Sequence, residues 1–234
     1  MSNWRSVVVA NDYGAKAKLD GTLGAVPHAY DFMAYAYLQL GQDLKARGLI
    51  QDTMSIKKVI GVPLAGATAR AAVPARYMLE RQDWQGAAEL QPAGTGFPMA
   101  EAITHFARAM GNARNGDPAA AAADIEKLKE QRAALEKAGQ GYWAGQVEIQ
   151  ILGAQAWAVE GQGNRSDALK FMRAAADLED ASEKHVAMEN RLYPMRELLA
   201  DMLMVQGEAA AALKEYESSL KNAPMRLRGH RAQG

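Results

Sequence analysis

Five short turns constrain the fold of this chain more than any other feature of its sequence. They recur at Gly41, Gln82, Gly116, Gly163 and Gly207, at intervals of 41, 34, 47 and 44 residues. The stretches between them are rich in Ala, Leu, Gln, Glu and Met, which are good helix formers, and their apolar residues recur at helical spacing. A helix–turn–helix unit of this size is typical of an α-solenoid, so we predict an all-α fold. An ordinary bundle of alanine-rich helices is the alternative.

The turn residues predict how one helix ends and the next begins. A glycine can adopt the left-handed conformation that ends a helix. Asp83, Asp117 and Asn164 are placed to cap the following helices, and Pro118 suits a first helical position. The predicted helices are Tyr30–Leu40, Leu44–Met54, Ala75–Arg81, Glu101–Arg114, Tyr142–Glu160, Ser166–Leu178, Glu197–Val205 and Ala209–Leu220.

The order of large, small and aromatic residues around the turns resembles that of tetratricopeptide (TPR) repeats. The first example is Tyr30-x-x-Met33-Ala34-x-x-Tyr37-x-x-x-Gly41-x-x-x-x-Ala46-x-x-x-Ile50, and the last is Leu199-Ala200-x-x-Leu203-x-x-x-Gly207-x-x-x-x-Ala212-x-x-x-Tyr216. The middle repeats keep the small and turn residues Ala75, Gln82, Ala87, Ala109, Gly116, Ala121, Ala156, Gly163, Ala168 and Ala175. The resemblance covers roughly residues 27–224 and implies a right-handed stack of about five TPR-like hairpins.

The same pattern predicts one domain. We expect a single helical-repeat domain over residues 1–224, with a soft boundary at 91–98, where Pro92–Pro98 is predicted to be a loop. The basic tail at 225–234 is expected to be disordered. Glu179–Arg191 is predicted to be a long polar connector. Both ends resemble interrupted repeats, so we interpret the chain as a segment of a longer bacterial TPR array, or as a protein whose open ends form a homodimer.

Composition narrows the possible partners. Lys and Arg number 27 and Asp and Glu number 27, so the formal net charge is zero and gives no electrostatic reason to expect nucleic acid or a membrane surface. Cysteine is absent, which excludes disulfides, thiolate metal sites and a cysteine nucleophile. The sequence shows no signal-peptide pattern and no long apolar run, so we predict a cytoplasmic protein.

Catalytic motifs are missing from the sequence. It contains no G-x-x-x-x-G-K-[ST], H-E-x-x-H or G-x-S-x-G pattern. His28-x-x-Asp31 and Glu101-x-x-x-His105 each place a histidine near a carboxylate, which favours a structural pair over a metal site. We therefore predict a non-enzymatic protein with no cofactor and no metal. The alternative is a small-molecule sensor or hydrolase-like site, in which the Glu179–Arg191 connector folds into the groove and His28, His105 or His185 lies with carboxylates in a closed pocket.

In TPR proteins the first helix of each hairpin lines a concave groove, and the resemblance implies the groove residues here. They are His28, Asp31, Tyr35, Gln39, Arg76, Glu80, Trp157, Glu160, Glu197 and Asp201, together with Phe106, Arg114 and Gln150. Because five of these side chains are acidic and two are arginines, we predict that a partner protein or peptide presents a cationic or mixed-charge segment. We expect Glu197 and Asp201 to be exposed, so that reversing their charges leaves the fold intact. An ordinary solvated helix face is the alternative.

Overall fold

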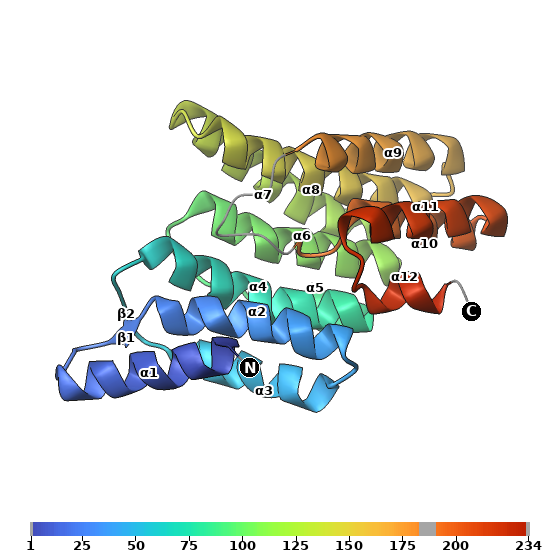
Figure 1. The fold of residues 1–234 in the computed structure, drawn as a ribbon. Helices are drawn as coiled ribbons and strands as arrows, with labels where there is room; N and C mark the ends of the chain where they lie inside the picture. Colours follow the sequence, from blue (N-terminus) through green and yellow to red (C-terminus); the bar gives the residue numbers. More distant parts are fainter. Residues whose placement is uncertain (1, 183–190, 233–234) are drawn as a thin grey trace.

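A computed structural model of the chain describes residues 2–182 and 191–232. These residues form twelve helices: α1 (Ser2–Lys16), α2 (Ala25–Gln39), α3 (Asp43–Ser55), α4 (Pro63–Arg81), α5 (Trp84–Ala88), α6 (Pro98–Arg114), α7 (Pro118–Lys137), α8 (Gly141–Gly161), α9 (Arg165–Ala181), α10 (Met195–Val205), α11 (Ala209–Asn222) and α12 (Leu227–Arg231) (Figure 1). In the described part of the chain, the strands are β1 (Thr22–Leu23) and β2 (Val59–Ile60), which pair in parallel. The predicted all-α class is confirmed for these residues.

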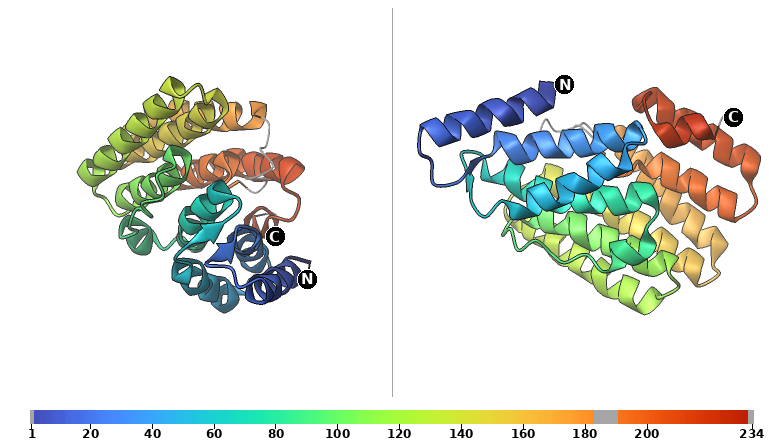
Figure 2. Two further views of the ribbon diagram at one scale, coloured as in Figure 1. Left: turned by 90° about the vertical axis from the view of Figure 1, so that its left-hand side faces the viewer. Right: turned by 90° about the horizontal axis from the view of Figure 1, so that it is seen from below.

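The helices pack in the order in which the chain makes them. α2 contacts α3 and α4, α4 contacts α5 and α6, and α6 contacts α7 and α8; α9 lies between α8 and α10, and α10 contacts α11. Figure 1 shows the helices rising from α1 at the bottom to α7, α8 and α9 at the top. The left view of Figure 2 shows that the path from α1 to α9 is curved. The C-terminal helices, in red, lie between α1 at one end of this curve and α9 at the other.

The turn chemistry is confirmed at the predicted residues. Asp83 accepts a hydrogen bond from the amide of Gly86, and Asp117 accepts one from Ala120, each at 2.9 Å. Asn164 accepts one from the amide of Asp167 at 3.4 Å. The turn glycines have positive φ angles between 67° and 85°, and Gln82 takes the same left-handed conformation at 54°. Each hairpin therefore closes through its own local residues.

The alanines that carry the family resemblance are buried between helices. Their side chains have little or no exposed surface, which is what a close approach of helix axes requires. They are Ala34, Ala46, Ala75, Ala87, Ala109, Ala121, Ala156, Ala168, Ala175, Ala200 and Ala212. Buried apolar side chains form one large cluster from α4 to α11 and a smaller one among α1, α2, α3 and α4.

Several element bounds differ from the sequence prediction. Helix α2 begins at Ala25, before the predicted Tyr30, and α4 begins at Pro63, well before the predicted Ala75. Proline at the start of α4 and of α6 fits the first turn of a helix, where its missing amide loses no hydrogen bond. The loop expected around 91–98 lies between α5 and α6.

The C-terminal segment, residues 224–232, differs most from expectation. The sequence predicted a disordered tail, but these residues include α12, which packs against α11, and the Arg226 side chain is fully buried. The segment turns back toward the N-terminal helices and reaches residues of α2, α4 and α10. We call this side of the three helices the inner face. Gln39, Glu80, Glu197 and Asp201 contact the segment, and the inner face also includes the neighbouring Asp31 and Arg76.

Candidate functional site

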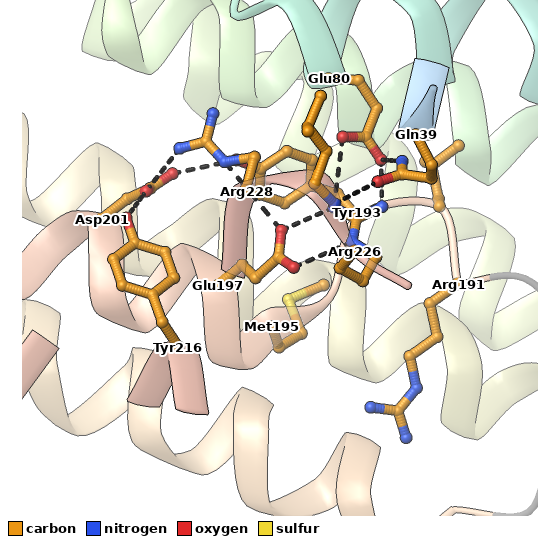
Figure 3. A network of polar contacts seen from close by, with 12 residues as sticks. Gln39, Glu80, Arg191, Tyr193, Met195, Glu197, Asp201, Tyr216, Arg226 and Arg228 are labelled. Atoms are coloured by element: carbon orange, nitrogen blue, oxygen red, sulfur yellow. Dashed lines mark hydrogen bonds and ion pairs between the residues drawn. The ribbon is translucent and has the colours of Figure 1, made fainter. Parts of the chain in front are cut away.

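The guanidinium group of Arg226 lies between two carboxylates of the inner face (Figure 3). Its Nε donates to Glu197 Oε1 at 2.9 Å and its Nη2 donates to Glu197 Oε2 at 2.6 Å. Its other edge faces α4, where Nη1 donates to Glu80 Oε1 and Nη2 donates to Glu80 Oε2 at 3.2 Å. Both long edges of one guanidinium are therefore held by acidic side chains.

Arg228 contacts a third carboxylate one turn further along α10. Its Nη2 donates to Asp201 Oδ1 at 2.6 Å. The hydroxyl of Tyr193 donates to Asp201 Oδ2 at 3.0 Å, and the hydroxyl of Tyr216 donates to Oδ1. We call Glu80, Glu197 and Asp201 the carboxylate cluster.

The aromatic ring of Tyr193 lies beside both arginines. The guanidinium carbons of Arg226 and Arg228 are 5.7 and 5.5 Å from the ring centroid, within the range of cation–π attraction. Gln39 completes the site from α2, because its Oε1 accepts a hydrogen bond from the Leu227 amide at 2.9 Å and its Nε2 donates to Glu80 at 3.2 Å. The inner face thus contacts the backbone of the segment as well as its side chains.

Burial and charge set the protonation states of this site. Burial alone would lower the pKa of Arg226, but the charges and hydrogen bonds of Glu80 and Glu197 raise it well above its ordinary value. Burial would also lower the pKa of Arg228, but Tyr193 and Asp201 raise it above its ordinary value. Burial is the largest cause of the raised pKa of Tyr193. Because both arginines stay charged and Tyr193 stays neutral, the arrangement suits binding better than proton transfer.

A second buried ion pair lies next to this site. Arg76 Nε and Nη2 both donate to Asp31 Oδ1 at 3.1 Å. Arg76 Nη1 also donates to the carbonyl oxygen of Arg191 at 2.7 Å, and the Tyr35 ring lies 5.7 Å from the Arg76 guanidinium carbon. This pair anchors the end of the connector before α10 to α2 and α4.

The structure brings together six of the ten predicted groove residues on the inner face, with Tyr35 at its edge. The others make different contacts. His28 packs against the Phe32 ring at 4.9 Å, and Glu160 accepts a hydrogen bond from Gln206. The Trp157 ring lies 4.0 Å from the guanidinium carbon of Arg114, which is also 4.9 Å from the Trp84 ring. Phe106 and Gln150 are buried.

The expectation that Glu197 and Asp201 are exposed is wrong. Glu197 has no exposed surface and Asp201 is 7% exposed, because the C-terminal segment covers them. Their charges are matched by arginines, so a lysine at either position would leave buried cations without a carboxylate. Charge reversal there is therefore expected to disrupt folding, and it does not serve as a test of binding.

Sequence reasoning missed the residues that fill the site. Arg226 and Arg228 were assigned to a tail, and Tyr193 was given no role. A signal for them was present, because the groove residues carried an excess of negative charge while the segment after Pro224 was basic. Nothing local in the sequence indicated that these two stretches meet.

The histidines do not form a common site in the described part of the chain. His105 Nδ1 lies 2.8 Å from Asp124 Oδ1, between α6 and α7, and not beside Glu101, which accepts a hydrogen bond from Thr95. Burial would raise the pKa of Asp124, but hydrogen bonds from His105 and Arg108 lower it below its ordinary value. His185 lies outside the described residues. Among the residues that are described, no group of three or more His, Asp or Glu side chains is placed to hold a metal ion.

Glu179 is the buried carboxylate with the most unusual titration. Burial raises its pKa to about 7, although Arg191 and the Met195 amide, which donate to its Oε2 at 3.0 and 2.8 Å, lower it. A cavity of about 50 Å3, lined in part by Gln150 and Tyr193, lies beside it. This volume is only large enough for water-sized molecules, so we assign Glu179 a structural role at the start of α10.

Comparisons with known proteins leave the family open. The chain matches no protein-family model, no curated protein and no solved structure. Among helices in the described ranges, none combines the length and the apolar character needed to cross a lipid bilayer.

Proposed function

We propose that this chain is a non-enzymatic protein-interaction module, built as an α-solenoid of about five TPR-like hairpins, whose inner face binds a peptide segment of a partner. The sequential packing of the helices and the buried alanines at the positions of the family pattern support the solenoid. The partner is a protein or peptide, since the balanced charge of the chain gives no reason to expect nucleic acid or a membrane. The chain has no cysteine and therefore needs no oxidising compartment in which to form disulfides, so the proposed location is the cytoplasm.

One observation carries the proposal. The inner face holds a peptide segment of this same chain, through both side chains and backbone: Arg226 and Arg228 contact the carboxylate cluster, and the Leu227 amide contacts Gln39. These are the kinds of contact by which a helical groove binds an external peptide.

The hydrolase-like alternative has less support. It needs a histidine beside a carboxylate in an enclosed pocket, but His105 lies between α6 and α7 and His28 packs against Phe32. The carboxylates of the inner face are engaged by arginines. A homodimer through the open ends stays a prediction.

A peptide-library selection on the full chain tests the proposed function. We expect recovered peptides to lose at least about tenfold in affinity when Tyr35→Ala and Gln39→Ala are added to the Arg226→Ala, Arg228→Ala chain, in which the C-terminal segment competes less, because each such contact contributes roughly 1 kcal/mol. The matched control is Glu126→Ala with Lys129→Ala, an exposed pair on α7. Recovery of no binding peptide, or of peptides equally sensitive to both double variants, would contradict the proposal.

A further inference from the structure

We infer that the inner face is a recognition site for an Arg-x-Arg segment of a partner protein, and that Arg226-Leu227-Arg228 occupies it as an intramolecular competitor. The inference rests on the proposed function and names the partner class. It is carried by the two arginine contacts, the position of Tyr193 between them and the charge of the carboxylate cluster.

The first position of the motif requires arginine. Glu197 receives two parallel hydrogen bonds from Nε and Nη2 of Arg226, and Glu80 receives hydrogen bonds from both terminal nitrogens. A planar guanidinium presents donors on both edges at once, whereas a lysine ammonium is a single point charge. Two carboxylates on opposite edges therefore select arginine over lysine.

The second position is set by spacing. Arg226 and Arg228 both lie near the Tyr193 ring, and Arg228 reaches Asp201 on the next turn of α10 after Glu197. The residue between them is recognised through its amide, which donates to Gln39. The site thus reads two arginines separated by one residue and accepts different side chains in between.

Charge favours exchange with an external segment of the same kind. Without the two arginines of the C-terminal segment, the carboxylates Asp31, Glu80, Glu197 and Asp201 outnumber the arginines Arg76 and Arg114 that lie near them, so the vacated site attracts cations. On the side of Met225, which is 74% exposed, the segment is open to solvent, and on the other side α12 is only five residues long. A partner that supplies the two arginines reproduces the main polar contacts.

Peptide binding to two forms of the full chain tests the inference. The probe is a fluorescent peptide with the sequence of residues 222–231, and its control replaces Arg226 and Arg228 with lysine and keeps Arg231. In the variant Arg226→Ala with Arg228→Ala the two guanidinium positions are emptied, so we expect it to bind the arginine peptide at least about tenfold more tightly than the lysine peptide. We expect the wild-type chain to bind the arginine peptide at least about tenfold more weakly than the variant does, because its own segment competes at high effective concentration. Equal binding of the two peptides by a folded variant would overturn the inference.

A displacement measurement on the otherwise intact chain covers the case in which that variant does not fold. Since the chain has no cysteine, dyes can be attached to Leu44→Cys on α3 and His230→Cys on α12, both exposed positions. Excess arginine peptide should lower energy transfer between the dyes, and lysine peptide should not. Unchanged transfer with the arginine peptide would overturn the inference. If library peptides bind the inner face without arginine, this inference fails while the proposed function stands; if none binds there, both fail.

Discussion

Buried charges in this protein are matched almost group by group. Arg76 pairs with Asp31, and Arg226 pairs with Glu80 and Glu197, each within hydrogen-bond distance. Removing one member of such a pair leaves the other charge desolvated, which costs more than the pair itself contributes. A substitution at one of these charges therefore has to be matched by a substitution at its partner if the fold is to be kept.

Glu179 provides a prediction at this scale. Its folded pKa is about 7 and its ordinary value is 4.5, so the folded chain holds a proton in this window that the unfolded chain has released. The free energy of unfolding must then fall as pH rises from about 4.5 to about 7. We expect Glu179→Gln to remove this part of the pH dependence, roughly 1–3 kcal/mol.

Urea unfolding of the wild type and Glu179→Gln at about pH 5 and about pH 8 checks this. The stability of the wild type relative to the variant should be lower at the higher pH. Glu126→Gln, at an exposed position on α7, serves as the control and should show no such change. A difference between wild type and Glu179→Gln that is the same at both pH values would contradict the assignment.

At the scale of elements, the hairpins depend on close backbone contact. A Cβ atom added to Gly111 on α6 would lie 2.5 Å from the Ala88 nitrogen and 2.6 Å from the Trp84 carbonyl oxygen of α5. Backbone atoms cannot move aside as a flexible side chain can. Gly111→Ala is therefore expected to force α5 and α6 apart and to destabilise the protein by about 1–3 kcal/mol.

Gly145→Ala is the matched control for this prediction. Gly145 lies inside α8 and has no atom within 4 Å of the added Cβ, so alanine should stabilise the helix by roughly 0.5–1 kcal/mol. Thermal unfolding of the two variants should show shifts of opposite sign. If both raise the melting temperature, the contact between α5 and α6 is not as close as described.

Elements with local causes were predictable from the sequence. The caps at Asp83, Asp117 and Asn164 follow from the residue types at the turns, and the helices follow from apolar spacing. Helix α12 was missed because five residues are too few to show a periodic pattern. The start of α4 was missed because a proline and a glycine, Pro63 and Gly66, interrupt the run of good helix formers there, although Gly66 packs closely against Val59.

At the scale of the whole molecule, the C-terminal segment returns to the inner face and joins helices that are far apart in the sequence. Arg226 and Glu80 are 146 positions apart in sequence, and the Leu227 amide reaches Gln39 across 188 positions. A single sequence shows the excess of acidic residues in the predicted groove but not which cation meets it. The C-terminal segment therefore links α2, α4 and α10 in a way that helix periodicity does not reveal.

A double-mutant cycle between Arg226 and Glu197 tests most directly whether the inner face binds arginine through its carboxylates. The cycle uses Arg226→Met and Glu197→Gln, singly and together, with unfolding free energies measured in urea. We expect a coupling energy of about 2 kcal/mol or more, because the two side chains share a buried, two-bond contact. The exposed pair Glu126 and Lys129 should give only about 0.2–0.5 kcal/mol. A coupling between Arg226 and Glu197 no larger than that of the exposed pair would contradict the account.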